Sequence, residues 1–333
     1  MSVDQNTNPV PGLPPVMTAA VLERPGAGAV DLREVAVPSP GPHDLLIRVR
    51  AAGVNPRDWM MVSGRYPFSW TLPRGAFVLG ADVAGEVAAA GSSVSGYRPG
   101  DRVFAMQTLS GGLGAFASWC VVRAGACARI PEGLTFASAA GIPLAGLTAY
   151  QGLGRRLAGR RILVIGASGG VGHLAVQIAT AAGAEVTGVC SGRNTDFIRE
   201  LGCRHVIDYE SDAFDGDHHR YDRVFDTIGR ESPARCRRVL VPGGCHVTTV
   251  PRRVALRRAA ADLGLGWLPR RKPTRLVLVR SSGARLAELA GLAAEGRLRC
   301  HVERTWPLSR VADALAASQS GRARGKLVLR IDS

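Results

Sequence analysis

The sequence has little lysine, few aromatic residues and no long apolar run. Only Lys272 and Lys326 are lysines, although 42 Lys+Arg stand against 27 Asp+Glu and the formal net charge is +15. Because arginine is spread along the chain and its densest run, from Arg252 to Lys272, contains a single aromatic residue, Trp267, this charge does not predict a nucleic-acid-binding surface. No window approaches the roughly 18 uninterrupted apolar residues that a membrane span needs. We therefore expect neither a nucleic-acid partner nor a membrane partner.

The seven cysteines form no C-x-x-C pair, and several lie within apolar runs. Such spacing is typical of reduced, buried thiols rather than of disulfides or a zinc site. The one histidine pair, His218 and His219, is a poor chelate because adjacent side chains on a loop do not converge on one ion. The prediction is therefore that the protein binds no metal.

The first 16 residues, Met1 to Val16, lack the basic start and the apolar centre of a signal peptide. We therefore expect a disordered tail over residues 1–16 and a cytoplasmic protein. With 333 residues, 46% of them hydrophobic and 21% charged, the chain is long enough for two domains with separate cores.

The region from Met17 to about Ile130 has the pattern of short strands separated by glycine and proline. Apolar and polar residues alternate from Leu46 to Arg50, and Pro99-Gly100-Asp101 is a turn signal. This pattern predicts an all-β, barrel-like first domain. Its expected strands are Thr18–Glu23, Asp31–Val37, Leu45–Gly53, Val83–Gly91, Asp101–Ala105 and Phe116–Val122.

A glycine cluster follows the apolar run from Arg161 to Ile165, and after it the hydrophobic period becomes helical. Ala167-x-Gly169-x-x-Gly172 fits the dinucleotide fingerprint G-x-G-x-x-G/A with alanine in the first position. Glycines there allow the backbone to approach a pyrophosphate at a helix N-terminus. The predicted cofactor-binding residues of this turn are Ala167, Ser168, Gly169, Gly170, Val171 and Gly172.

Strands and helices alternate after this turn, which predicts a parallel sheet covered on both faces. The Rossmann domain is expected at residues 137–280, beginning with an alanine-rich helix from Ala137 towards Leu157 and ending with a strand from Thr274 to Val279. A helix is expected at Gly283–Gly296 and another at Leu308–Ser318. The apolar strand Lys326–Ile331 should return to the first domain, which then comprises residues 17–136 and 281–333.

Several motifs in this order resemble the medium-chain dehydrogenase/reductase superfamily, and most closely its zinc-free quinone oxidoreductase (zeta-crystallin-like) branch. They are Ala51–Asp58, Ser63–Pro67, Leu79–Gly85, Pro99–Val103, Leu147–Tyr150, Gly166–Gly172, His205–Tyr209 and Gly325–Leu329. The resemblance implies an α/β protein in which a GroES-like β-rich catalytic domain accompanies a doubly wound Rossmann domain. Zinc-dependent relatives carry a ligand cysteine where Asn55 stands and His-Glu where Ala81-Asp82 stands, so the resemblance implies zinc-free chemistry.

The cofactor preference depends on the loop after the second Rossmann strand. An NAD site places an acid near its tip, whereas Ser191 and Arg193 stand here and can bind a 2′-phosphate. NADPH is therefore expected, the alternative being that Arg193 is simply an exposed loop residue. By family resemblance Tyr209 is a further contact with the adenine-ribose phosphate, although it could instead close a local core.

The remaining candidate positions come from the resemblance. It implies that Asn55, Thr148, Thr227, Val250 and Lys326 lie near the nicotinamide. Asn55 can donate to the acceptor carbonyl or to the ribose, while Thr148, expected at a helix start, could serve only as a cap.

The predicted catalytic residues are Asn55 and Tyr66. Tyr66 is the candidate aromatic wall or proton donor, its alternative being a packed turn residue. Asp58 is expected to be structural. Hydride transfer to a quinone or enone needs alignment and stabilisation of charge on the acceptor oxygen, and water can supply the proton.

The resemblance therefore implies an NADPH-dependent reductase of quinones or α,β-unsaturated carbonyls. The alternatives are an enoyl-thioester reductase and a non-catalytic NADPH-binding protein with a structural or partner-docking role. Arg275–Val279 is expected at an edge of the Rossmann sheet, where pairing across a two-fold axis would form a homodimer.

Overall fold

The computed structural model describes residues 12–108, 114–216, 220–250 and 272–332, and it divides into two compact units. The first unit is drawn from Met1–Leu144, Ser281–Glu295 and Cys300–Ser333, and the second from Ala145–Arg280 and Gly296–Arg299. The predicted domain bounds of 17–136, 137–280 and 281–333 stay predictions. Residues 1–11 of the predicted tail and the His218–His219 pair lie outside the described residues, while a strand already begins at Val16, inside the predicted tail.

The described residues of the first unit form two β-sheets. The strand order is β2-β1-β4 in the smaller sheet and β15-β16-β3-β5-β6-β8 in the larger, where β7 also pairs with β3. Their bounds are β1 Val16–Leu22, β2 Asp31–Ala36, β3 Asp44–Val54, β4 Phe77–Val78, β5 Asp82–Ala90, β6 Arg102–Met106, β7 Trp119–Arg123, β8 Cys127–Arg129, β15 Val302–Pro307 and β16 Lys326–Arg330.

Strand β3 shows why this sequence folds as a sheet. Leu45, Ile47 and Val49 belong to one core cluster, whereas Leu46 between them belongs to another. Alternate side chains of a strand point to opposite faces, so β3 buries residues on both sides. Each such burial stabilises the fold by about 1.5–3 kcal/mol.

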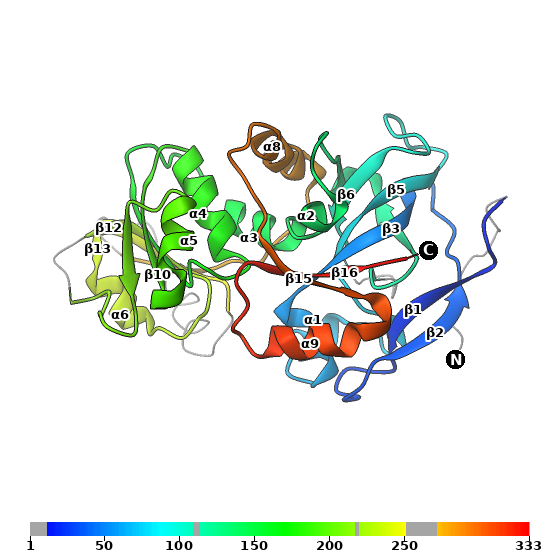
Figure 1. Cartoon of the computed structure of the whole chain (residues 1–333), viewed down its shortest axis with the longest axis horizontal. Helices are drawn as coiled ribbons and strands as arrows, with labels where there is room; N and C mark the ends of the chain where they lie inside the picture. The colour runs from blue at the N-terminus through cyan, green and yellow to red at the C-terminus, as the bar shows by residue number, and fades with distance from the viewer. Residues whose placement is uncertain (1–11, 109–113, 217–219, 251–271, 333) are drawn as a thin grey trace. The chain divides into compact units, whose positions relative to one another are not determined.

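The C-terminal strand returns to the first unit as predicted. β16 pairs antiparallel with β3, with Leu327 opposite Val54 and Arg330 opposite Ala51. Figure 1 shows this red strand beside the blue strand β3. The short helices α1 (Pro56–Val62) and α9 (Val311–Gln319) also pack against each other in this unit.

The second unit contains one parallel sheet with the strand order β11-β10-β9-β12-β13-β14. The order reverses between β9 and β12, which is the topological switch point of a doubly wound fold. Helix α4 packs on β9 and β10, α5 on β11 and α6 on β13. Figure 1 labels these three helices around the strands β10, β12 and β13 of this sheet. The bounds are β9 Arg161–Ile165, β10 Glu185–Cys190, β11 His205–Asp208, β12 Tyr221–Asp226, β13 Leu240–Thr248, β14 Thr274–Leu276, α4 Gly172–Ala181, α5 Thr195–Glu200 and α6 Pro233–Arg238.

Three predicted elements differ in detail. The long helix expected from Ala137 is divided into α2 (Phe136–Ala140) and α3 (Pro143–Leu153), because the ring of Pro143 disfavours a helical conformation of the residue before it. β14 ends at Leu276 rather than Val279, and β7 begins at Trp119 rather than Phe116. The helix expected at Gly283–Gly296 is confirmed as α8 (Gly283–Ala294), which Ser282 caps by accepting a hydrogen bond from Arg285 N.

Candidate active site

The carboxyl ends of four parallel strands of the second unit form one edge of its sheet. Ile165 of β9 lies opposite Val189 of β10 and Asp226 of β12, while Thr248 of β13 lies opposite Asp226. The segments that follow these strands carry most of the predicted cofactor contacts. This edge therefore brings together Ala167, Ser168, Gly169, Gly170, Val171, Gly172, Ser191, Arg193, Thr227 and Val250.

The glycine turn has a backbone that other residues would disrupt. Gly166 has φ 78°, in the region that favours glycine, and its carbonyl accepts a 3.0 Å hydrogen bond from Gly169 N. A Cβ on Gly172 would collide with the carbonyl oxygen of Gly166. The turn therefore keeps the close backbone approach that a pyrophosphate at the start of α4 requires, and its residues fit such a group.

A buried amide joins this turn to the loop after β10. Asn194 Nδ2 donates to Ser168 Oγ at 3.1 Å and to Ser191 Oγ at 3.2 Å. Asn194 and Ser191 are 5% and 6% exposed. Both serines are among the predicted cofactor contacts, whereas Asn194 is not, because an asparagine in a loop usually signals only a turn.

An acid also stands beside this loop, although none occurs in the loop sequence itself. Asp208 ends β11 opposite Cys190, and its Oδ2 lies 2.5 Å from where a Cβ of Gly192 would be. Its other carboxylate oxygen accepts a 3.0 Å hydrogen bond from Glu210 N. The expectation of a loop tip without an acid is therefore corrected: the carboxylate comes from the neighbouring strand.

The other predicted residues of this edge have defined surroundings. Thr227 Oγ1 donates to Ile165 O at 2.8 Å, and the Thr227 carbonyl accepts from Thr249 Oγ1 at 3.2 Å. Val250 packs so closely on Gly229 that a Cβ there would collide with it. Tyr209 is 59% exposed, so it does not close a local core.

Thr148 lies in the middle of α3 rather than at a helix start. The helix begins at Pro143, a residue favoured in the first turn because it has no N–H to satisfy, so Thr148 is not a cap. It is 5% exposed, and its contact with a cofactor stays a prediction.

The first unit contains a second polar group, which we call the Lys326 cluster: Asn55, Asp82 and Lys326. Lys326 Nζ donates to Asn55 Oδ1 at 2.5 Å and to Val54 O at 3.2 Å, and it lies 3.5 Å from Asp82 Oδ2. The Asn55 amide donates to Asp82 Oδ2 at 2.9 Å and to Gly53 O at 3.2 Å. All three residues are at most 3% exposed, so the ammonium and the amide direct their donors to protein acceptors.

Asp58 supports this cluster from the start of α1. Its Oδ2 accepts a 2.8 Å hydrogen bond from Asn55 N, which fixes the backbone of Asn55. Burial raises the pKa of Asp58 to about 7, while Arg57 opposes the shift. Burial also raises the pKa of Asp82, against the favourable charge of Lys326.

The positions that hold zinc in zinc-dependent relatives do not fit a metal here. The Lys326 ammonium lies against Asn55 and repels a second cation, and Ala81 offers no ligand atom. The segment Gly141–Ala145, in which the family resemblance implies no counterpart of the later ligand cysteine, contains no cysteine. A Cβ on Gly141 would collide with Cys300 Sγ, so the buried Cys300 thiol packs directly against this glycine. Among the described residues, no group of three or more His, Cys, Asp or Glu side chains is placed to hold a metal.

Tyr66 belongs to an aromatic row in the first unit. Its ring packs edge-on against Phe68 with centroids 6.0 Å apart, and Phe68 packs in the same way on Trp70 at 5.5 Å. The guanidinium carbon of Arg57 lies 5.7 Å from the centroid of Tyr66. Trp70 is 76% exposed, so the end of this row faces solvent.

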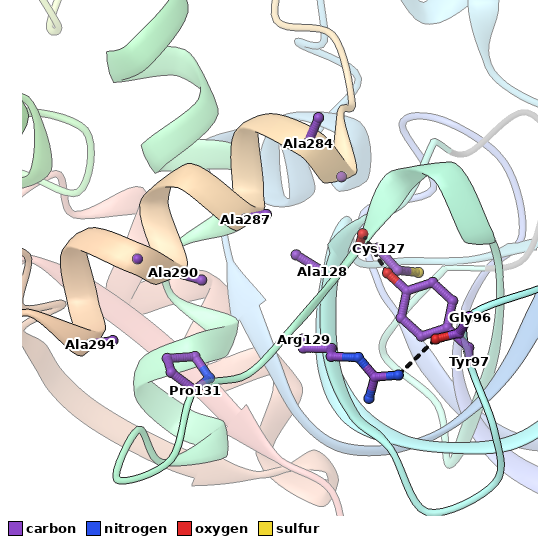
Figure 2. Close-up of a pocket in the computed structure, with 12 residues that line it drawn as sticks. Gly96, Tyr97, Cys127, Ala128, Arg129, Pro131, Ala284, Ala287, Ala290 and Ala294 are labelled. Carbon is purple, nitrogen blue, oxygen red and sulfur yellow. Dashed lines mark hydrogen bonds between the residues drawn. The ribbon is translucent and has the colours of Figure 1, made fainter.

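A cavity of about 600 Å³ lies elsewhere in the first unit, between Tyr97, Arg129 and the alanines of α8 (Figure 2). Tyr97 donates its hydroxyl to Cys127 O at 2.9 Å, and Arg129 donates to Gly96 O at 2.7 Å. Arg129 also pairs with Asp101 at 2.7 Å. These polar groups bind one another, and none of the predicted site residues lines the cavity.

Comparison with known proteins identifies the family. An alcohol dehydrogenase GroES-like domain matches residues 41–132, and a zinc-binding dehydrogenase domain matches residues 201–329. The chain is 34% identical over 331 residues to the chloroplastic quinone-oxidoreductase QR1 of Triphysaria versicolor, covering 94% of this chain and 98% of that protein. The chain belongs to the zinc-free quinone oxidoreductase branch of the medium-chain dehydrogenase/reductase superfamily. This membership confirms the predicted α/β class with a GroES-like domain and a Rossmann domain.

Other relatives in the superfamily extend the comparison. A mitochondrial NAD(P)H oxidoreductase of Mus musculus is 31% identical, covering 87% of this chain and 82% of that protein. A pikromycin polyketide synthase component of Streptomyces venezuelae is 38% identical over 90% of this chain but only 8% of its own length. The solved quinone oxidoreductase of Coxiella burnetii superposes with a TM-score of 0.85 at 28% identity, covering 95% and 100% of the two chains. The chain is thus a nicotinamide-dependent oxidoreductase by family.

The described helices are all too short or too polar to cross a membrane.

Proposed function

We propose that this protein is an NADPH-dependent, zinc-independent oxidoreductase that transfers a hydride to a quinone or an α,β-unsaturated carbonyl. The observation that carries the proposal is the buried Ser191 hydroxyl beside the glycine turn, in a loop that also holds Arg193. Hydroxyl and guanidinium donors suit a 2′-phosphate, which distinguishes NADPH from NADH.

Residues of each unit have a proposed role in the reaction. Residues Ala167–Gly172 would bind the pyrophosphate, while Ser191, Arg193 and Tyr209 would bind the adenine-ribose phosphate. Thr148, Thr227 and Val250 are proposed to position the nicotinamide. When bound, the reduced cofactor supplies the hydride.

In the first unit, the donors of the Lys326 cluster would stabilise charge that develops on an acceptor oxygen. Asn55 would act on the acceptor or ribose by exchanging its Gly53 contact, at 3.2 Å the longer of its two donor contacts, for a ligand oxygen. Lys326 would hold Asn55 in place, and Tyr66 would form the wall against a planar acceptor or donate the proton.

The proposal is tested by steady-state assays that pair each cofactor with each acceptor. NADPH and NADH are compared with a quinone, an α,β-unsaturated ketone and a crotonyl thioester. Turnover of the quinone or the ketone with NADPH, at a kcat/KM at least tenfold above that with NADH, is expected. Turnover only with NADH, or with none of the acceptors, would contradict it.

An enoyl-thioester reductase is the second candidate, because Asn55–Asp58 resembles the pattern of those enzymes and one relative is a polyketide synthase component. Preferential turnover of the crotonyl thioester in the same assay would favour it. Tight NADPH binding without turnover of any acceptor, together with a stable partner in pull-down experiments, would instead favour the non-catalytic role.

A homodimer is also proposed. Among the described strands, β14 is the last in the order of its sheet, and Leu278 just beyond it is 62% exposed. Pairing two such edges would cover both. Light scattering is expected to give twice the chain mass, and a monomeric mass would contradict the dimer. The cytoplasmic location stays a prediction, since relatives are named chloroplastic and mitochondrial.

A further inference from the structure

The Asn194 side chain is a hydrogen-bond donor at the centre of a trio formed by the buried Ser191 and Asn194 and the half-buried Ser168. Its Nδ2 carries two hydrogens, and these are directed to Ser168 Oγ at 3.1 Å and to Ser191 Oγ at 3.2 Å. The backbone N–H of Asn194 also donates to the Ser191 carbonyl at 2.9 Å. The amide is therefore fixed to one loop and reaches the other.

This arrangement determines whether the two serine hydroxyls are hydrogen-bond donors or acceptors toward other groups. A hydroxyl has one hydrogen, and an oxygen that accepts from Asn194 must direct that hydrogen elsewhere. Among the described residues, neither Ser168 nor Ser191 donates its hydroxyl hydrogen to another protein group. Ser191 is only 6% exposed, and a buried donor without an acceptor is costly unless a ligand supplies one.

We propose that Asn194 is a positioning residue that makes the Ser168 and Ser191 hydroxyls donors toward an anionic ligand, and thereby sets the preference for NADPH. The inference rests on the proposed function, because it concerns the same phosphate-binding edge. Ser168 belongs to the turn for the pyrophosphate, which NADPH and NADH share. Ser191 belongs to the loop for the 2′-phosphate, which only NADPH carries, so loss of Asn194 weakens NADPH more than NADH.

Binding of NADPH and NADH to the full-length protein, followed by cofactor fluorescence, tests this without relying on turnover. Asn194→Ala is expected to weaken NADPH about tenfold and NADH less than threefold. Asn194→Asp replaces the donor by an acceptor, so both hydroxyls turn inward to it, and NADPH is expected to weaken still more. Thermal unfolding of each variant checks the fold independently.

A double-substitution cycle shows whether Asn194 acts through Ser191. In the Ser191→Ala protein, Asn194→Ala is expected to leave the ratio of the NADPH and NADH dissociation constants unchanged. A merely structural asparagine would weaken both cofactors equally in either background, and that result would overturn the proposal. If Asn194→Ala fails to fold, the variants Ser168→Ala and Ser191→Ala provide the test. A loss of NADPH affinity without a loss of NADH affinity in Ser191→Ala alone supports the proposal, and equal losses of NADPH and NADH affinity in both variants overturn it.

The wild-type protein separates this inference from the function on which it rests. A wild type that binds neither cofactor overturns the proposed function as well. A wild-type preference for NADPH that survives Asn194→Ala overturns only the role of Asn194.

Discussion

The Lys326 cluster is a fully buried polar group and the Ser168–Ser191–Asn194 trio is buried except for the half-buried Ser168, and the two groups differ in how their hydrogen-bond donors are used. In the cluster, the Lys326 ammonium and the Asn55 amide direct their donors to protein oxygens within 3.5 Å. In the trio, the amide donors are used but two hydroxyl hydrogens have no acceptor among the described residues. We call a polar group saturated when each of its donors has a protein acceptor; such a group stabilises the fold and sets a local potential. A group with donor hydrogens that lack a protein acceptor is unsaturated, and it can bind a ligand through them.

Removal of the positive charge from the Lys326 cluster should cause the largest change, a loss of folding stability. Lys326→Met leaves Asp82 buried without its cation, so unfolding free energy should fall by about 3–5 kcal/mol in denaturant titrations. Lys272→Met is the matched control, since Lys272 is the only other lysine and donates to Arg237 O at 3.0 Å. A loss below about 1 kcal/mol in Lys326→Met would mean that the cluster does not stabilise the fold.

Asp58 should make stability depend on pH. Because burial raises its pKa to about 7, the folded protein keeps a proton that the unfolded chain releases near pH 4. The contribution of protonated Asp58 to the free energy of unfolding is therefore complete below about pH 4 and is lost as pH rises through about 7. Its size is on the order of 2–4 kcal/mol.

The measurement is the difference in unfolding free energy between wild type and Asp58→Asn across this pH range. The difference is needed because burial lowers the pKa of His246 to about 4, which changes stability in the opposite direction. Parallel pH profiles for the two proteins would contradict the assignment to Asp58.

The unsaturated trio should respond in affinity rather than stability. Ser191→Ala removes one donor to an anionic ligand and should raise the NADPH dissociation constant about tenfold, or about 1.4 kcal/mol, with little change in melting temperature. Ser282→Ala is the contrasting control, because it removes the cap of α8 and should cost about 1 kcal/mol of stability without affecting NADPH. A destabilised Ser191→Ala with unchanged affinity would remove the distinction between the two polar groups.

Substitution of Asp208 should cause the smallest of these changes, a modest gain in NADPH affinity. Its carboxylate lies beside Gly192, so Asp208→Asn should reduce repulsion of a 2′-phosphate and tighten NADPH about twofold to threefold. NADH titrations serve as the comparison and should not change. Equal tightening of both cofactors would place the effect of Asp208 outside phosphate recognition.

The sequence predicts those features of the site that depend on residues close together along the chain. The glycine turn and the serine after β10 follow directly from local spacing. Asp208 was missed because it reaches the loop from an adjacent strand, and the contacts of Asn55 were missed because Asp82 and Lys326 lie 27 and 271 residues away. Thr148 was misplaced because the break at Pro143 moves the helix start.

Titration of NADPH and NADH into the wild-type protein is the most direct test of the central claim that the buried serine loop binds a 2′-phosphate. The dissociation constant for NADPH is expected to be at least tenfold below that for NADH, and higher salt should reduce this difference. Equal affinities, or tighter binding of NADH, would contradict it.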